Sequence, residues 1–329
     1  GNRSVVRGAV GSSKHESVEE SPSAGAPSES SAGSAKPRVA LAVVVTRPPN
    51  LEWMDALAVF AFAADRALAS LRADRLAIVP ESFPIQSVSA LAELGFDVRP
   101  LPIPVPLAQI RNAYARSQVQ RAGCCGDAEE LKYYGASFTE YQHVLVLDVD
   151  ELILKPIDEI FQQFEGGALV GTNNHNLDTP DSAFPMVQGG FLLFSPCQRD
   201  FQALVELTRE GDYRSDSGWK GSHTGLGWGG SGPQGLLSFY YNQVRPGQAG
   251  FAGELPQRGY DVPGNFTRQP AGSRFFPLDH TVYNVVLPWM DRLQKFFPWR
   301  AQFSERFVAS RVKVFHFTGR CQKPWRCAR

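Results

Sequence analysis

The chain has 329 residues, and its 33 Lys and Arg residues balance its 33 Asp and Glu residues, so the formal net charge at pH 7 is zero. This balance excludes a protein that holds nucleic acid or an anionic membrane surface by bulk positive charge, and we expect no nucleic-acid partner. No apolar run approaches the roughly 20 residues that a membrane-spanning helix needs, so the sequence predicts no transmembrane segment in this chain.

Residues 1–36 differ in composition from the rest of the chain. They contain 10 Ser, 5 Gly, 5 Ala and 2 Pro and no aromatic residue. Such a segment buries too little apolar surface to offset the loss of chain entropy, so we expect a disordered tail or stalk. Residues 37–329 carry every aromatic residue and every cysteine, and we expect them to form one domain with a large core.

The predicted domain opens as alternating strands and helices. A β-branched run at Val39–Val45 predicts a strand that is buried on both faces, and Pro48 and Pro49 end it. Helical spacing and a short apolar run then predict a helix, a strand and a second helix, at Glu52–Leu71, Leu76–Val79 and Val88–Leu94. This alternation is typical of a parallel α/β sheet.

Similar elements continue toward the C-terminal end. We expect further helices at Ala128–Phe138, Ile157–Phe164, Phe201–Arg209 and Gly235–Tyr241. Apolar, strand-like segments lie at Val144–Leu147, Ala168–Gly171, Val187–Phe194, Val282–Leu287 and Val312–Phe317. Residues 211–232 hold eight glycines together with Trp219 and Trp228, which predicts a long irregular loop.

Two aspartates directly follow the expected strand at Val144–Leu147. Asp148 and Asp150 stand where ligands bind in open α/β sheets, and alternate residues of a strand share one face. Paired carboxylates at this spacing suit Mg²⁺ or Mn²⁺, which also bind phosphate oxygens. A solvated turn is the alternative interpretation of the triplet by itself.

A second group of candidate site residues lies near the C-terminal end. His316 stands in the aromatic sequence Val314–Phe317 and is followed by Gly319 and Lys323. His316 could supply a third metal ligand, and Lys323 could supply a cation for phosphate. The alternatives are a core histidine and an ordinary surface lysine.

Together these two groups resemble the glycogenin-like enzymes of glycosyltransferase family 8. The resemblance rests on the strand that ends in Asp148-x-Asp150 and on His316-Phe317-x-Gly319 followed by Lys323-Pro324-Trp325. It extends in the same order along the chain to Leu131–Tyr134, Gln188–Pro196, Gln234–Leu237 and Tyr283-Asn284. It implies a GT-A-like α/β fold: one domain with a mostly parallel central sheet flanked by helices.

The resemblance also implies a function. The chain would be a metal-dependent, retaining hexosyltransferase that moves a sugar from a UDP-sugar to a glycan or protein acceptor. Mn²⁺ (or Mg²⁺) would be held by Asp148, Asp150 and His316. The resemblance assigns donor binding to Thr46, Asp148, Gly189, Gly190, Gly319 and Lys323, and it places Lys132, Gln188 and Gln234 at the reacting sugar. The sequence offers no clear carboxylate nucleophile, which favours same-face displacement over covalent double displacement.

Three departures from the family pattern keep an alternative open. Pro233 stands where the family has Asp, Gln188 stands where it has Asn, and one additional residue separates Gly319 from Lys323. The alternative is a catalytically degenerate protein that binds a nucleotide or glycan on the same fold. We expect residues 211–232 to shape the acceptor side, with a docked or sugar-stacking role for their tryptophans; a disordered insertion is the alternative. A homodimer is compatible with the sequence.

The cellular compartment has two candidates. The serine-rich start, the sequons at Asn2 and Asn265 and the Cys321/Cys327 pair favour a Golgi or secretory lumen. A cytoplasmic, glycogenin-like role is the alternative.

Overall fold

The computed structural model describes Gly1 and residues 38–71, 73–121, 125–162, 168–173, 186–245, 273–286 and 310–317. Apart from Gly1, the predicted tail lies outside these residues, so its disorder and the domain boundary after residue 36 stay predictions. Gly319 and Lys323 of the expected donor site also lie outside the described residues.

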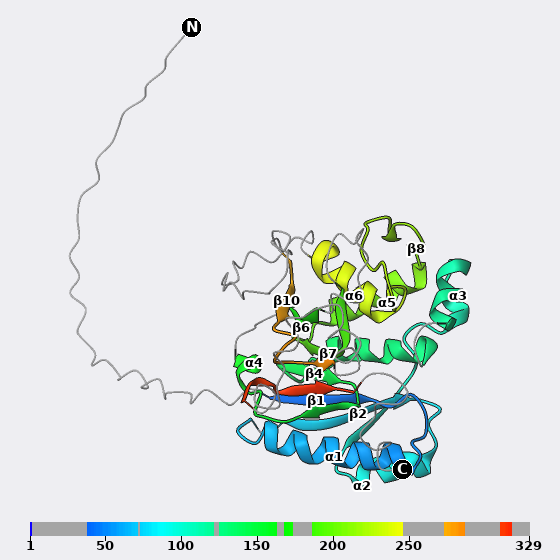
Figure 1. Ribbon diagram of the computed structural model, residues 1–329. Coiled ribbons are helices and arrows are strands. Elements are labelled where there is room, and N and C mark those ends of the chain that lie inside the picture. Colours follow the sequence, from blue (N-terminus) through cyan, green and yellow to red (C-terminus); the bar gives the residue numbers. More distant parts are fainter. Residues whose placement is uncertain are drawn as a thin grey trace, which may run out of the picture. The chain divides into compact units, whose positions relative to one another are not determined.

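A seven-stranded sheet forms the centre of the fold, in the order β10-β6-β7-β4-β1-β2-β3 (Figure 1). Adjacent strands run parallel, except that β7 is antiparallel to both β4 and β6. The predicted α/β fold with a mostly parallel sheet is therefore confirmed. The strands are β1 (Val39–Val44), β2 (Asp74–Pro80), β3 (Asp97–Leu101), β4 (His143–Leu147), β6 (Leu169–Asn173), β7 (Val187–Phe194) and β10 (Phe275–Leu278).

Helices cover both faces of this sheet (Figure 1). Along β1, Val39, Leu41 and Val43 belong to one buried cluster, whereas Ala40 and Ala42 belong to the other, as the alternation of a strand requires. The first cluster includes residues of α1 (Leu51–Ala67), α2 (Ile85–Glu93) and α4 (Glu159–Gln162). The second includes residues of α3 (Ala113–Arg121), η2 (Gly126–Ala136), α5 (Gln198–Glu210) and α6 (Pro233–Phe239).

A smaller, three-stranded sheet brings the C-terminal part of the chain to the end of β4. In it, β12 (Val314–His316) pairs antiparallel with β5 (Glu151–Ile153) and parallel with β11 (Val285–Val286). This register sets His316 opposite Glu151, the residue that directly follows Asp150. The two late strands predicted from the sequence are thus confirmed in shorter form, whereas β5 was not predicted.

Two regions differ from their predictions. The segment predicted as a helix at Ala128–Phe138 forms an 11-residue 3₁₀ helix, η2. Its side chains Glu130, Tyr133 and Ala136 are buried at a spacing of three residues, which matches the three residues per turn of that helix type. Residues 211–232 are also more regular than expected, because they contain a hairpin of β8 (Tyr213–Arg214) and β9 (Gly218–Trp219).

The remaining short elements are a 3₁₀ turn, η1 (Leu107–Gln109), and a π-helical turn, η3 (Tyr240–Val244), which continues α6. No helix in the described part of the chain combines the length and apolar character needed to cross a bilayer. Cys125 is disulfide-bonded and Cys197 is a free thiol. The predicted Cys321/Cys327 pair lies outside the described residues.

Candidate metal centre

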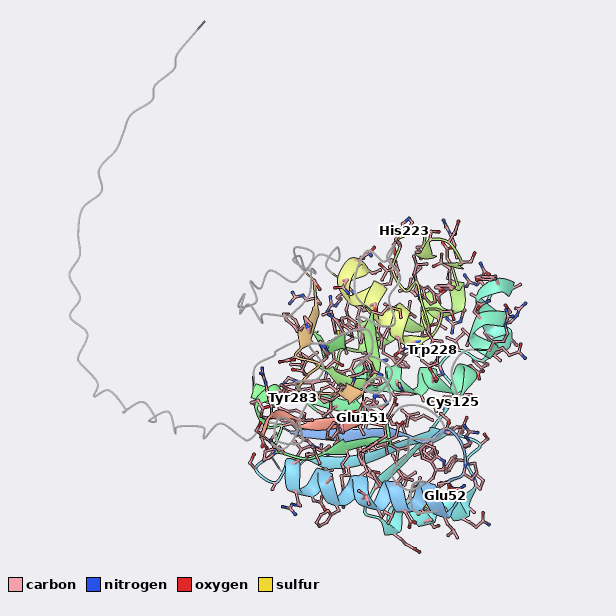
Figure 2. The ribbon with its side chains drawn as sticks, viewed as in Figure 1. Glu52, Cys125, Glu151, His223, Trp228 and Tyr283 are labelled. Atoms are coloured by element: carbon pink, nitrogen blue, oxygen red, sulfur yellow. The ribbon has the colours of Figure 1, made fainter. Side chains whose placement is uncertain are left out.

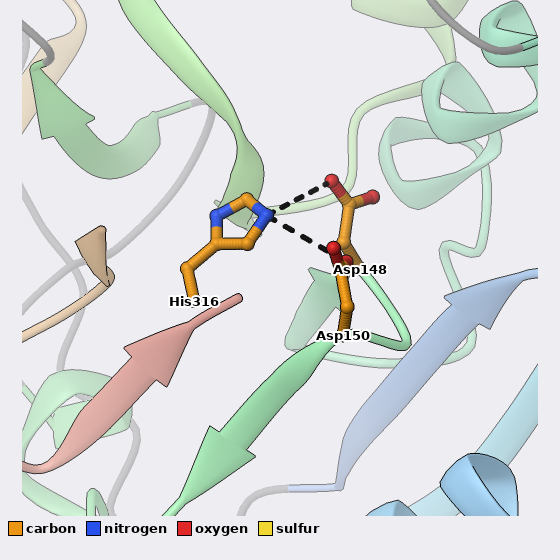
Figure 3. A group of neighbouring side chains, drawn as sticks. All are labelled: Asp148, Asp150 and His316. Atoms are coloured by element: carbon orange, nitrogen blue, oxygen red, sulfur yellow. Dashed lines mark ion pairs between the residues drawn. The ribbon is translucent and has the colours of Figure 1, made fainter. Parts of the chain in front are cut away.

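Asp148 and Asp150 lie on a tight turn that joins β4 to β5. The Glu151 N–H donates to the Asp148 carbonyl oxygen at 3.0 Å, so the chain reverses directly after β4. This turn, rather than the alternation of a strand, brings the two carboxylates to one place (Figure 3). The Asp148 side chain is 30% exposed, and Asp150 is buried.

His316 faces both carboxylates from the end of β12 (Figure 3). Its Nε2 is 3.9 Å from Asp148 Oδ2 and 3.6 Å from Asp150 Oδ1. One ligand atom from each of the three residues can be chosen so that all lie within 4.8 Å of one another. The structure therefore brings together the three residues that the sequence predicts as metal ligands.

Asn284 decides which nitrogen of His316 carries the proton. The Asn284 amide nitrogen donates to Thr172 Oγ1 at 2.8 Å and to Gln188 Oε1 at 2.7 Å. The amide oxygen therefore faces His316 Nδ1, at 2.7 Å. Because that oxygen only accepts, Nδ1 carries the proton and Nε2 presents its lone pair to the two aspartates.

The buried imidazole is also neutral near pH 7. Burial lowers the pKa of His316 to about 4, even though the Asp148 carboxylate acts in the opposite direction. Two aspartate side chains and an unprotonated ring nitrogen thus face one another. This donor set of oxygen and nitrogen lone pairs fits a divalent cation such as Mn²⁺ or Mg²⁺.

Lys132 supplies the positive charge that the structure shows at this site. Its Nζ is 2.7 Å from Asp148 Oδ1, and it donates to the Gly189 carbonyl oxygen at 2.9 Å. Burial, the largest single influence, lowers the pKa of Lys132, but Asp148 and, after it, Glu129 together outweigh burial and raise the pKa above its usual value. Lys132 is therefore a charged ammonium beside the candidate metal ligands.

β7 lines the next side of the site. The Gly189 N–H donates to Gln234 Oε1 at 2.8 Å, and the Gly190 N–H donates to Gln188 Oε1 at 2.5 Å. A Cβ at Gly190 would lie 2.5 Å from His316 Cε1, so only glycine at this position leaves room for the imidazole. Lys132, Gln188, Gly189, Gly190 and Gln234 are thus brought together with the metal ligands.

Two site residues were missed in the sequence. Asn284 was noted only as half of a Tyr-Asn pair, although it is buried and has a positive φ of 61°. Glu151 is buried beside His316 Nδ1, at 3.3 Å, and neither of its carboxyl oxygens has a hydrogen-bond partner among the described residues. Burial, and secondarily the Asp148 carboxylate, raise the pKa of Glu151 well above its usual value. The signal in the sequence that could have identified Glu151 as a site residue is its position directly after Asp150.

Thr46 lies two residues beyond the end of β1, the parallel neighbour of β4, and it is half-buried. It is therefore at the same edge of the sheet as Asp148. Gly319 and Lys323 cannot be placed, because they lie outside the described residues, and their roles stay predictions.

The same fold occurs in solved glycosyltransferase structures. The apo form of the glycosyltransferase GlyE of Streptococcus pneumoniae matches with a TM-score of 0.51 and 11% identity, over 88% of this chain and 56% of GlyE. The fold is that of the GT-A glycosyltransferases. At this identity the likeness shows the fold alone, and the chain spans about half the length of GlyE.

Two further structures match with lower TM-scores. Mouse xyloside xylosyltransferase 1 has a TM-score of 0.48 and 14% identity, over 87% of this chain and 99% of that one. The galactosyltransferase LgtC, solved with donor and acceptor sugar analogues, has a TM-score of 0.48 and 13% identity, over 86% of this chain and 88% of that one. No protein-family profile matches the sequence, and no curated protein matches it.

Proposed function

We propose that the protein is a metal-dependent, retaining glycosyltransferase of the family 8 type that moves a hexose-type sugar from a UDP-sugar to a glycan or protein acceptor. The observation that carries this proposal is the arrangement of Asp148, Asp150 and the unprotonated Nε2 of His316 at the end of β4. This arrangement stands at the carboxyl edge of a sheet whose fold is shared with glycosyltransferases.

The proposed donor is held through its diphosphate. A divalent cation at Asp148, Asp150 and His316 would supply the charge that neutralises the diphosphate as it leaves. The Lys132 ammonium adds a second positive charge 2.7 Å from Asp148. Thr46, Gly189, Gly190, Gly319 and Lys323 are the further donor-binding residues of the proposal.

The proposed transfer exchanges one bond to the anomeric carbon for another. The bond from that carbon to the β-phosphate oxygen breaks, and its electron pair leaves with UDP. The hydroxyl oxygen of the acceptor bonds to the carbon on the same face, and its proton passes to the departing phosphate oxygen. Gln188 and Gln234 would orient the sugar, since their side chains are fixed by the N–H groups of Gly190 and Gly189.

Release of UDP from a panel of UDP-hexoses, in Mn²⁺ and in EDTA, tests the proposal. We expect release with at least one donor in Mn²⁺ and its loss in EDTA. If no donor gives metal-dependent release and UDP with Mn²⁺ does not raise the melting temperature, the proposal is wrong.

A catalytically silent binding protein is the second candidate, because Pro233 occupies the family's Asp position. Pro233 is buried at the first turn of α6, beside Gln234, and has no polar side chain to offer. This candidate predicts that UDP and Mn²⁺ bind and raise the melting temperature while no donor is turned over.

We also propose the secretory lumen, with the Golgi as its principal candidate, over the cytoplasm. The disulfide at Cys125 supports this choice, since disulfides persist in oxidising compartments. Intact-mass measurement of protein from its native cells, alkylated with and without reductant, would show fewer free thiols than five before reduction. Five free thiols before reduction would favour the cytoplasm.

A further inference from the structure

A pocket adjoins the candidate metal centre. It is a small pocket that is open to solvent. Lys132, Gly189 and Gln234 of the site form part of its lining, and Glu129, Trp228 and Gly229 form another part. The pocket therefore joins the residues proposed to hold the donor sugar to residues that have no assigned role.

Trp228 is the unusual member of this lining. Its neighbour in the same glycine-rich loop, Trp219, is 2% exposed, whereas Trp228 is 67% exposed. An exposed indole forgoes the stabilisation that burial of a large aromatic side chain supplies. The two tryptophans thus have different roles: Trp219 is part of the core, and the expected sugar-stacking role can apply only to Trp228.

The loop that carries Trp228 is held in place by hydrogen bonds to its backbone. Trp219 Nε1 donates to the Gly230 carbonyl oxygen at 2.8 Å, and the Tyr213 hydroxyl donates to the Gly225 carbonyl oxygen at 3.1 Å. These bonds attach both ends of the stretch 225–230 to buried aromatic side chains. Trp228, which is labelled in Figure 2, is consequently presented on an anchored loop.

The same loop touches Gln234. Gly229 has a φ of 76°, and a Cβ at this position would lie 2.2 Å from Gln234 Nε2. The loop backbone therefore lies directly against the amide nitrogen of Gln234. The amide oxygen of the same side chain accepts from the Gly189 N–H. Trp228 is thereby held next to the residue proposed to lie at the anomeric carbon.

Glu129 supplies an acceptor for hydroxyl groups in the same pocket. It is half-buried on η2, three residues before Lys132. A carboxylate offers about four acceptor positions, so it can bind hydroxyls in addition to its contacts within the protein. An aromatic face together with a few placed polar groups is the usual lining of a site for a small organic ligand.

We propose that Trp228 and Glu129 form an acceptor subsite that binds a pyranose ring, with the indole stacked on the C–H face of the ring and the carboxylate accepting from its hydroxyls. This inference rests on the proposed function, and it selects a glycan over a peptide as the acceptor. Lys132, the cation in this pocket, is already engaged by Asp148 and Gly189, so the pocket offers an anionic peptide no new positive charge.

Saccharide binding without turnover tests the subsite. Saturation-transfer NMR is recorded on the full chain with UDP and Mn²⁺, and separately without them, against methyl glycosides of glucose, galactose, mannose and xylose and against short acidic and neutral peptides. UDP affinity is measured on the same samples by calorimetry, so failure of nucleotide binding and failure of the subsite are distinguishable. The variants are Trp228→Ala, Trp228→Phe and Glu129→Gln. Phe62→Ala is the matched control, because Phe62 is 63% exposed on α1 and does not line the pocket.

We expect at least one pyranoside to bind the wild type. Trp228→Ala should weaken that binding about tenfold, as expected from loss of about 1.4 kcal/mol of aromatic contact. Trp228→Phe should retain most of the affinity, Glu129→Gln should weaken it, and Phe62→Ala should leave it unchanged. UDP affinity should be the same in all variants.

Three results would each overturn the inference. One is that no pyranoside binds the wild type, or that only the peptides do. Another is that Trp228→Ala binds the sugar as tightly as the wild type does. The last is that Trp228→Ala loses UDP affinity in the same proportion, which would assign Trp228 to the donor or to the stability of the loop.

Discussion

Asn284 adopts an unusual backbone conformation and also determines which ring nitrogen of His316 carries the proton. Its φ of 61° is sparsely populated by residues other than glycine, and asparagine tolerates it better than most. From this position its amide orients His316 so that Nε2, rather than Nδ1, faces the aspartates. The sequence contains no local signal for this contact, because Asn284 and His316 are 32 positions apart and meet only when β11 pairs with β12.

Replacing Asn284 by glycine should weaken Mn²⁺ binding by about tenfold or more, since residues that orient metal ligands typically have effects of this size. Glycine adopts the positive φ without strain, so the loss of Mn²⁺ affinity reports the missing side-chain amide and not a change in the backbone. Electron paramagnetic resonance of free Mn²⁺ measures the affinity. Asn284→Ala should lose the same affinity and also about 1 kcal/mol of stability. Unchanged Mn²⁺ affinity in Asn284→Gly would show that the amide does not position His316.

Glu130 should make stability depend on pH. Burial, and secondarily the Asp127 carboxylate, raise the pKa of Glu130 from 4.5 to about 9, while its Oε2 accepts from the Val105 N–H. The folded state therefore binds this proton more tightly than the unfolded state. The stabilisation is fully present below pH 4.5 and is lost as the pH rises toward about 9.

Glu130→Gln keeps an acceptor for Val105 and is neutral at every pH. We expect it to raise the free energy of unfolding at pH 8 by on the order of 1–2 kcal/mol and to flatten its decline between pH 5 and 8. Urea titrations at both pH values measure this, with the exposed Glu93→Gln as the control. If the free energy of unfolding of Glu130→Gln depends on pH as it does in the wild type, the raised pKa of Glu130 is refuted.

At the scale of elements, the strands with continuous apolar runs could be predicted, and the short ones could not. β4 and β7 are buried along their whole length and β1 along all but its last residue, so their sequences carry the signal of a central strand. β5 and β8 have three and two residues, and α3 buries only Ala115 and Val119, so none of them shows a usable period. Such elements are stabilised by their partners rather than by their own pattern.

The position of η2 depends on a close approach to the sheet. A Cβ at Gly135 would lie 2.4 Å from a ring carbon of Phe194 and 2.8 Å from Val146 Cγ2. We expect Gly135→Ala to lower the free energy of unfolding by about 1–3 kcal/mol, because the helix must move or the core must distort. Gly232→Ala, whose Cβ would be 3.6 Å from the Gly229 oxygen, should cost less than about 1 kcal/mol. If chemical denaturation shows the same loss of stability in Gly135→Ala and Gly232→Ala, the close approach of Gly135 to the sheet is contradicted.

For the whole molecule, the candidate metal centre links distant segments, so a bound cation should stabilise the entire fold. Asp148 and Asp150 follow β4, whereas His316 ends β12. A ligand at about 100 times its dissociation constant adds about 2.7 kcal/mol to the free energy of unfolding. We therefore expect Mn²⁺ with UDP to raise the melting temperature by several degrees over EDTA, measured by calorimetry.

Asp150→Ala should abolish that rise and the metal-dependent turnover. Its melting temperature in EDTA should stay close to that of the wild type, since neighbouring carboxylates repel one another when no cation is bound. A full Mn²⁺-induced rise in Asp150→Ala would remove Asp150 from the metal site.

The sequence by itself determined the α/β class, the main strands and helices and the residue types of the candidate metal centre, because strand and helix periods and the Asp-x-Asp triplet are local patterns. Only the tertiary structure decided that β7 runs antiparallel, that Asn284 selects the His316 tautomer, and that Trp219 is buried while Trp228 is exposed. These features depend on contacts between residues far apart in the chain, which strand pairing and burial create and no local period records. The zero net charge of the whole chain likewise left open a local concentration of charge, which the fold assembles at the end of β4.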